Sequence, residues 1–340
     1  MTTVDYQASS RFTLLPRLNW REWLRRLGPL VGLIFVFGVF SALRPATFLG
    51  PFNLRIMLLQ TAVVGTAALG MTIIIISGGI DLSVGSNVAL CSVVIAYLIN
   101  AGAPPVLAAL GGIATGVLVG AVIGLLVSGM KLSPFIVTLG LMGVLRGTAK
   151  WVADNGVLYA PPELHLGDQW IGRLLQLDTT HWWMVIPPGV WILAVLAVLV
   201  AGLLRYTKFG RHVFAIGSNE QTARLCGVRI GLTKVLIYMV VAGLVGIAAL
   251  FHYSKVSSQG DPTSALGMEL DVIAAVVIGG ASLTGGEGTV LGSLAGALMM
   301  TAVGNGCQKM GYPTFVQEIV TGAIIVIAAA LDRLRQQKTG

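Results

Sequence analysis

Charged residues are scarce in this sequence. Only 11% of its 340 residues are charged, 55% are hydrophobic, and the mean hydropathy is +0.85. A soluble domain usually carries about 25% charged residues, so the composition excludes an ordinary soluble globular protein. The hydrophobic stretches are continuous, whereas an outer-membrane barrel needs short alternating strands. We therefore predict an all-α, polytopic integral membrane protein.

The sequence also lacks the motifs of the common hydrolases. It contains no GxxxxGK[ST], HExxH, GxSxG or CxxC stretch. The histidines and cysteines are scattered along the chain: His165, His181, His212, His252, Cys91, Cys226 and Cys307. We expect the cysteines to act as small buried hydrophobic residues. The prediction is a protein with no catalytic residue, metal or cofactor, so any ATP that drives it is hydrolysed by another polypeptide.

The net charge of +8 reflects membrane topology and not a nucleic-acid partner. Lys and Arg concentrate in residues 1–27, in 205–234 and in the C-terminal tail, whereas residues 153–184 are mainly acidic. Because loops rich in Lys and Arg stay on the cytoplasmic side, we expect both termini and 205–232 to be cytoplasmic and 153–184 to form an outer loop.

Hydrophobic length predicts about ten transmembrane helices, since a helix needs about 20 apolar residues to cross the bilayer. We place the spans at 28–44, 54–76, 83–101, 105–129, 133–152, 185–204, 233–253, 268–284, 289–305 and 315–331. At 70–90 and 268–292, glycine-rich breaks allow half-helices or re-entrant segments as alternatives to full spans. The expected organisation is a cytoplasmic segment 1–27, a single membrane domain 28–331 and a cytoplasmic tail 332–340.

The stretch Ser77–Ser86, with the sequence SGGIDLSVGS, separates two apolar runs. Non-helical backbone at membrane depth is tolerated only where protein or water satisfies it. We expect Ser83 to cap the following helix and Asp81 to lie near its positive end. The candidate pathway residues here are Gly78, Gly79, Asp81, Ser83 and Gly85; the alternative is an ordinary loop between two spans.

A second glycine-rich stretch, residues 279–293, repeats this composition. Its candidate pathway residues are Gly279, Gly280, Gly285, Gly286 and Glu287. Transporters often build their pathway from broken helices in two related halves. An inverted repeat needs the two stretches on opposite sides of the membrane, whereas the predicted spans place both on the same side.

Ionisable residues within the predicted spans are functional candidates because burying charge in lipid is costly. Asp81 and Glu287 lie in glycine-rich breaks and are the candidates for lining or gating a pathway. Arg146 is a further candidate, but its side chain could instead reach the membrane–water interface. For the acids Glu269 and Asp271 the alternative is a structural role at the start of a helix.

The basic loop contains a predicted short helix over Glu220–Cys226. Asn219 can cap its start and Gly227 can end it. Two interpretations remain open: an amphipathic linker lying on the membrane surface, or a docking helix that enters a groove on a partner.

Two of these stretches resemble one known family. SGGIDLSVGS is similar to the signature of the permease subunits of ribose/xylose/arabinose-type ABC sugar importers, and residues 208–228 are similar to that family's form of the EAA loop, which couples permeases to their ATPases. The matching positions of the loop are Gly217, Asn219, Glu220, Ala223 and Gly227, whereas Gln221 and Thr222 replace the usual alanines.

The resemblance implies a multi-pass permease in a bacterial inner membrane that imports a monosaccharide. It further implies an ABC ATP-binding subunit docked on the coupling loop, a periplasmic sugar-binding protein on the outer face and a second permease copy, as a homodimer. The alternatives are an ABC permease for branched-chain amino acids, autoinducer or nucleosides, and a self-contained ion-coupled transporter.

Overall fold

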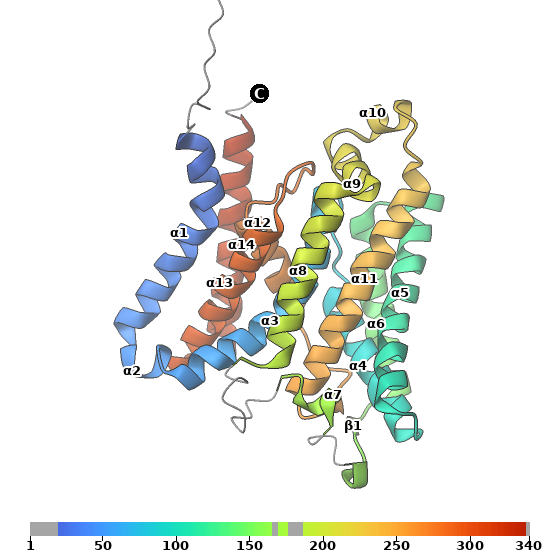
Figure 1. Ribbon diagram of the computed structural model, residues 1–340, viewed down its shortest axis with the longest axis vertical. Coiled ribbons are helices and arrows are strands. Elements are labelled where there is room, and N and C mark those ends of the chain that lie inside the picture. Colours follow the sequence, from blue (N-terminus) through green and yellow to red (C-terminus); the bar gives the residue numbers. More distant parts are fainter. Residues whose placement is uncertain (1–19, 165–168, 176–185, 338–340) are drawn as a thin grey trace, which may run out of the picture.

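The computed structural model describes residues 20–164, 169–175 and 186–337. Segment 1–19 and the histidines His165 and His181 lie outside the described residues. Helices form one bundle (Figure 1). Their bounds are α1 (Trp20–Leu43), α2 (Pro45–Phe48), α3 (Pro51–Ile76), α4 (Val84–Asn100), α5 (Pro105–Gly129), α6 (Pro134–Val152), η1 (Pro162–Leu164), α7 (Trp170–Arg173), α8 (Pro188–Tyr206), α9 (Lys208–Ser218), α10 (Glu220–Leu225), α11 (Ile230–Lys255), α12 (Met268–Ile278), α13 (Val290–Lys309) and α14 (Thr314–Gln337).

Apolar helices long enough to cross a bilayer confirm the predicted fold class. Within the described residues, α3, α5, α6, α8, α11 and α13 each meet the length and hydropathy of a membrane span. Shorter apolar stretches lie in α1, α4 and α14. The only strands in the described ranges, β1 (Leu158–Tyr159) and β2 (Gln259–Gly260), form a short antiparallel pair. The chain is an all-α, multi-pass membrane protein.

The predicted span 268–284 differs from the structure. Helix α12 has only 11 residues and ends at Ile278, so it is about 16 Å long at 1.5 Å per residue and crosses about half of the hydrocarbon layer. The chain reaches its start through residues 256–267, which run along α4: Gly260 lies against Val93 and Ala96, and Ala265 against Gly85. An extended segment followed by a short helix is the half-helix alternative for the second glycine-rich break.

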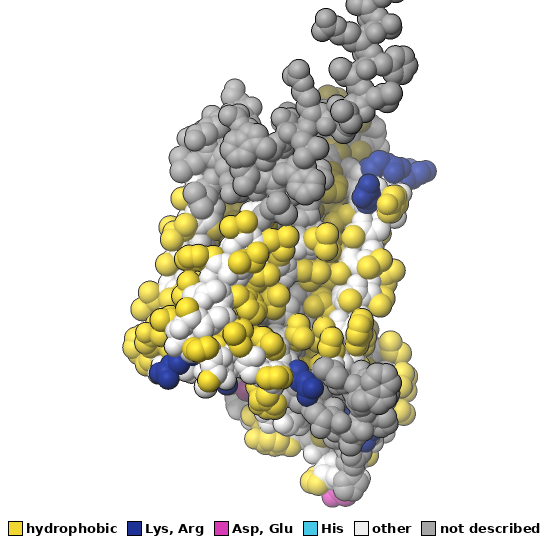
Figure 2. Space-filling view, turned by 60° about the vertical axis from the view of Figure 1, so that its left-hand side comes forward, with side chains coloured by type: hydrophobic (Ala, Val, Ile, Leu, Met, Phe, Trp, Pro, Cys, Tyr) yellow, Lys and Arg dark blue, Asp and Glu magenta, His cyan; other side chains and the backbone are white. Residues whose placement is uncertain are grey.

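Helices α3 and α13 form the centre of the bundle. Every residue from Gly65 to Ile76 of α3 is buried, and a helix that is hydrophobic all round must be enclosed by protein or lipid. In helices α5, α6 and α8, by contrast, a third or less of the apolar window is buried, and the other residues are half-buried or exposed. Figure 2, which brings the α1 side of the bundle forward, shows hydrophobic side chains as a broad band, with the visible charged side chains at its upper and lower edges.

Helix α5 packs closely on α11 through a regular row of small residues, Gly116, Gly120 and Gly124, whereas Gly112, one turn earlier, lies against Ile95 and Cys91 of α4. An added Cβ at Gly124 would lie 2.6 Å from the Cα of Val235, and one at Gly120 would lie 2.7 Å from the Cβ of Ala242. The fourfold spacing places these glycines on one face, so the two backbones approach as in other membrane helix pairs.

The bundle has two distinct ends. The start of α1, the end of α14 and helices α9 and α10 lie together at one end, and β1 and α7 lie at the other (Figure 1). We call the first the coupling end and the second the distal end. Both glycine-rich stretches lie at the coupling end, as the helix directions of α3 and α13 require.

Candidate functional site: the glycine junction and the coupling helices

The two glycine-rich stretches contact each other, although about 200 residues separate them in sequence. The backbone N–H of Gly286 donates a hydrogen bond to the carbonyl oxygen of Ile76, at 2.8 Å. Gly78, Gly285 and Gly286 all have positive φ angles, of 80°, 89° and 78°. Only glycine adopts that conformation without strain, so these residues let two tight turns stack.

The last turn of α9 fits between these turns. A Cβ added to Gly285 would lie 2.7 Å from the carbonyl oxygen of Gly217 and 3.0 Å from the Cα of Gly78. A Cβ on Gly217 itself would overlap the Ile76 carbonyl oxygen and lie 2.7 Å from the Gly286 nitrogen. We name the contact of Gly78, Gly217, Gly285, Gly286 and Ile76 the glycine junction.

Asp81 is buried and already has partners. Its carboxylate accepts hydrogen bonds from the backbone N–H of Ser83, at 2.8 Å, and from the Ser83 hydroxyl, at 2.6 Å. Ser83 occupies the N-cap position of α4 but makes no side-chain cap, so the predicted cap is wrong. Its backbone is already helical and its hydroxyl is turned toward Asp81, to which it donates. Asp81 therefore fixes the shape of the loop that leads into α4.

Neighbouring helices hold this loop in place. The hydroxyl of Thr138, on α6, lies 3.4 Å from the carbonyl oxygen of Ile80. A Cβ on Gly79 would lie 3.1 Å from the hydroxyl oxygen of Tyr238, on α11. Glu287, by contrast, is exposed, so the two acids proposed from sequence have opposite environments.

The first turns of α4 and α12 meet at Gly85, where the close contact leaves no room for a side chain. A Cβ on Gly85 would lie 2.5 Å from the carbonyl oxygen of Ala265 and would overlap the carboxylate of Glu269. Glu269 and Asp271 lie in the first turn of α12, as predicted. Arg146 fixes the segment before it, because its Nη1 donates to the carbonyl oxygens of Pro262, at 2.7 Å, and Ser264, at 2.6 Å.

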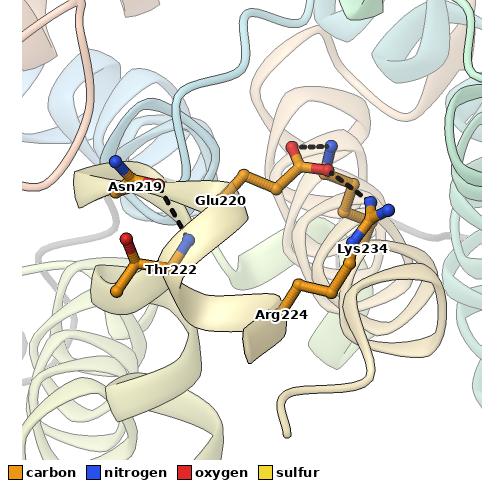
Figure 3. A network of polar contacts seen from close by, with 5 residues as sticks. All are labelled: Asn219, Glu220, Thr222, Arg224 and Lys234. Atoms are coloured by element: carbon orange, nitrogen blue, oxygen red, sulfur yellow. Dashed lines mark hydrogen bonds and ion pairs between the residues drawn. The ribbon is translucent and has the colours of Figure 1, made fainter. Parts of the chain in front are cut away.

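Helix α10 begins at the predicted residue, Glu220, and ends at Leu225, one residue before the predicted end (Figure 3). The side chain of Asn219 accepts a hydrogen bond from the Thr222 N–H at 2.8 Å, and Gly227 ends the helix with a φ of 84°. Glu220 binds Lys234 of α11 at 2.7 Å and Arg224 at 3.4 Å. These local contacts connect α10 to a long membrane helix.

One face of α10 is packed and the other is free. Ala223 is buried with Ile216 and Ile230, and Val228 packs against them. Leu225 is 89% exposed, and Cys226 is also exposed; for Cys226 the predicted burial is therefore wrong, whereas Cys91 and Cys307 are buried. Leu225 and Cys226 leave an apolar tip at the coupling end.

The amino-acid sequence does not predict the contact of Gly217 in the junction. Gly217 is a candidate only through the family resemblance of the loop, and no local pattern places it against Ile76. The glycine row of α5 was readable from its spacing, because small residues four apart are typical of packed membrane helices.

The fold and this end of the bundle define a polytopic membrane permease. The chain belongs to the family described as the branched-chain amino acid transport system / permease component, which matches residues 53–329. No solved structure matches the chain.

Named relatives are similar over most of the chain. The ribose import permease protein of Bacillus subtilis is 38% identical over 317 residues, covering 93% of this chain and 95% of the relative. The L-arabinose ABC transporter permease protein of Azospirillum brasilense is 34% identical, covering 90% and 88%. The fructose import permease protein of Rhizobium meliloti is 32% identical, covering 90% and 84%.

Proposed function

We propose that this chain is the membrane-spanning permease subunit of an ABC importer that carries a monosaccharide across a bacterial inner membrane. A separate subunit hydrolyses the ATP, and a periplasmic sugar-binding protein delivers the cargo. Support for the cargo class comes from the relatives named for ribose, arabinose and fructose. Two copies of the chain form the pore in this proposal.

The observation that carries the proposal is the glycine junction. The exposed short helix α10 follows directly after α9. The last turn of α9 contacts the loops before α4 and before α13. Because protein interiors are close-packed and transmit strain, movement of α10 by an ATPase displaces both loops together. In this proposal Leu225 and Cys226 face the ATPase, and Gly217, Asn219, Glu220, Ala223 and Gly227 shape the coupling loop.

The glycine-rich loops then control access to the pathway. Gly78, Gly79, Asp81, Ser83 and Gly85 form the first loop. The second contains Gly279, Gly280, Gly285, Gly286 and Glu287. Each state of the ATPase favours one of two arrangements of these loops. This is required because an effector shifts a conformational equilibrium only by binding the two conformations unequally.

The proposed topology follows from the ends of the bundle. The coupling end, with both termini and the loop 205–232, is cytoplasmic, and the loop 153–184 is outside. The membrane domain covers 28–331, between the segment 1–27 and the tail 332–340. The excess of Lys and Arg in 205–232 supports this orientation.

The family description favours one other cargo, a branched-chain amino acid. Uptake measured with the transporter reconstituted with its partner subunits distinguishes a monosaccharide cargo from an amino-acid cargo. We expect ATP-dependent uptake of a monosaccharide, tested first with D-ribose, and none of leucine. Uptake of leucine alone assigns the other cargo, and uptake driven by an ion gradient without partners refutes an ABC permease.

A further inference from the structure

Helix α11 connects the two ends of the bundle (Figure 1). It has 26 residues, from Ile230 near the coupling end to Lys255 near the distal end, and no proline interrupts it. Because an α-helix rises 1.5 Å per residue, Lys234 and Ser254 are about 30 Å apart along this helix. That distance is roughly the thickness of the hydrocarbon layer. One helix therefore joins contacts on the two faces of the membrane.

At its distal end, α11 binds the outer loop. The buried hydroxyl of Ser254 donates a hydrogen bond to the carbonyl oxygen of Gly172, at 2.9 Å, and accepts one from the backbone N–H of Leu175, at 3.1 Å. Gly172 lies in the short helix α7 and Leu175 follows its end, where a helix lacks partners for its last carbonyl groups. A single hydroxyl group of α11 therefore fixes the end of α7.

Apolar packing holds the same segment against the bundle. Ile171, Leu174 and Leu175 are buried in the main hydrophobic core. Because protein interiors are close-packed and transmit strain, α7 cannot slide independently of the helices around it. A protein that binds the loop 153–184 and displaces α7 must therefore shift α11 or break these contacts.

At the coupling end, the same helix binds α10 through an ion pair. The Nζ of Lys234 lies 2.7 Å from a carboxylate oxygen of Glu220, the first residue of α10 (Figure 3). Leu225, the last residue of α10, belongs to the exposed apolar tip. Ser254 and Lys234 thus attach α11 to one segment on each face of the membrane.

Helix α11 is also supported between these two contacts. A Cβ added to Gly246 would lie 2.8 Å from the Cα of Ile113, and one added to Gly243 would lie 3.2 Å from the side chain of Val117, both on α5. Glycine is the least favourable residue in a helix after proline, so these are the positions where α11 would bend most readily. Contact with α5 encloses both, and rigid helices of this kind can carry coupling between distant sites.

We propose that α11 is the relay through which the loaded sugar-binding protein stimulates the ATPase. Docking on the outer loop moves α7, Ser254 transmits that movement to α11, and Lys234 transmits it to α10. Ser254 and Lys234 act through these neighbours and are positioning residues. The proposal rests on the function proposed above and adds the route between the two partner proteins.

The first test removes the distal contact. Ser254→Ala deletes both hydrogen bonds to the outer loop and leaves the coupling end unchanged. In the complete transporter in nanodiscs, we expect wild-type basal ATP hydrolysis, whereas stimulation by ribose-loaded binding protein should fall at least about fivefold, the lower limit of typical coupling between sites. Ser92→Ala is the matched control and should keep full stimulation, because Ser92 is buried but its hydroxyl donates within its own helix, to Ala89. Full stimulation in Ser254→Ala overturns the relay.

The affinity of the binding protein gives an independent readout. Coupling between two binding sites is reciprocal, so the nucleotide state of the transporter must change the affinity for ribose-loaded binding protein through the same route. This affinity is measured with a non-hydrolysable ATP analogue and without nucleotide. We expect Ser254→Ala to remove the difference that the wild type shows between the two states. A difference equal to that of the wild type overturns the relay.

The second test reverses the ion pair at the coupling end, and it decides the proposal if Ser254→Ala does not fold. Lys234→Glu brings two carboxylates together and should lower stimulation at least about fivefold. Addition of Glu220→Lys restores opposite charges and should recover most of the stimulation. Full stimulation in Lys234→Glu, or no recovery in the double variant, overturns the relay and leaves the proposed function intact. Absence of stimulated hydrolysis in the wild type refutes the proposed function, and the relay with it.

Discussion

Substitution of Gly217 by alanine is the sharpest test of the glycine junction. On helix propensity alone, this change in α9 should stabilise the protein by about 1 kcal/mol. The junction predicts the opposite sign. The new methyl would overlap the Ile76 carbonyl oxygen and lie 2.7 Å from the Gly286 nitrogen, where ordinary contacts are 3.4–4 Å.

Neither neighbour can move independently. The Gly286 N–H and the Ile76 carbonyl are joined by the 2.8 Å hydrogen bond, so the methyl must separate them and leave both groups unpaired. The cost of such a break is about 1–3 kcal/mol, and backbone displacement adds to it. We therefore expect the α9 turn to withdraw from the loops.

The assay compares sugar uptake and ATP hydrolysis in the reconstituted transporter. Gly217→Ala should insert and assemble, as judged by size-exclusion chromatography, yet lose at least about tenfold in uptake, which corresponds to about 1.4 kcal/mol. Gly202→Ala, in α8 with open space around it, is the matched control and should behave as wild type. Wild-type uptake in Gly217→Ala would refute transmission through the junction.

Other substitutions test separate contacts. Asp81→Ala removes both hydrogen bonds to Ser83 and should destabilise the loop by about 2–4 kcal/mol, measured as a lower melting temperature and lost uptake; unchanged melting would contradict the assigned role. Leu225→Asp should abolish ATPase binding in a pull-down without changing the melting temperature, because Leu225 is exposed; retained binding would place the docking surface elsewhere. Arg146→Ala should increase proteolysis at 256–267 by releasing the bonds to Pro262 and Ser264, and unchanged cleavage would argue against this anchor.

Features set by neighbours in sequence were predictable. The ends of α10 follow from Asn219 and Gly227, because capping depends on a few adjacent residues. The all-α membrane fold follows from continuous apolar runs, because lipid offers no partner for the backbone. Glu269 and Asp271 at the start of α12 follow from the preference of acids for helix N-termini.

Features set by distant contacts were not predictable. Residues 268–284 are apolar enough for a span, and the early end of α12 depends on Gly279 and Gly280 turning toward α13. The junction itself joins three segments that no local pattern connects.

The measurement that tests the central claim most directly is ATP hydrolysis in nanodiscs. The chain is assayed alone, then with its ATP-binding subunit, and then with ribose-loaded binding protein added. We predict no hydrolysis by the chain alone and stimulation by the loaded binding protein that Gly217→Ala abolishes. Stimulation that survives Gly217→Ala, or sugar flux by the chain alone under an ion gradient, would contradict an ABC permease coupled through the glycine junction.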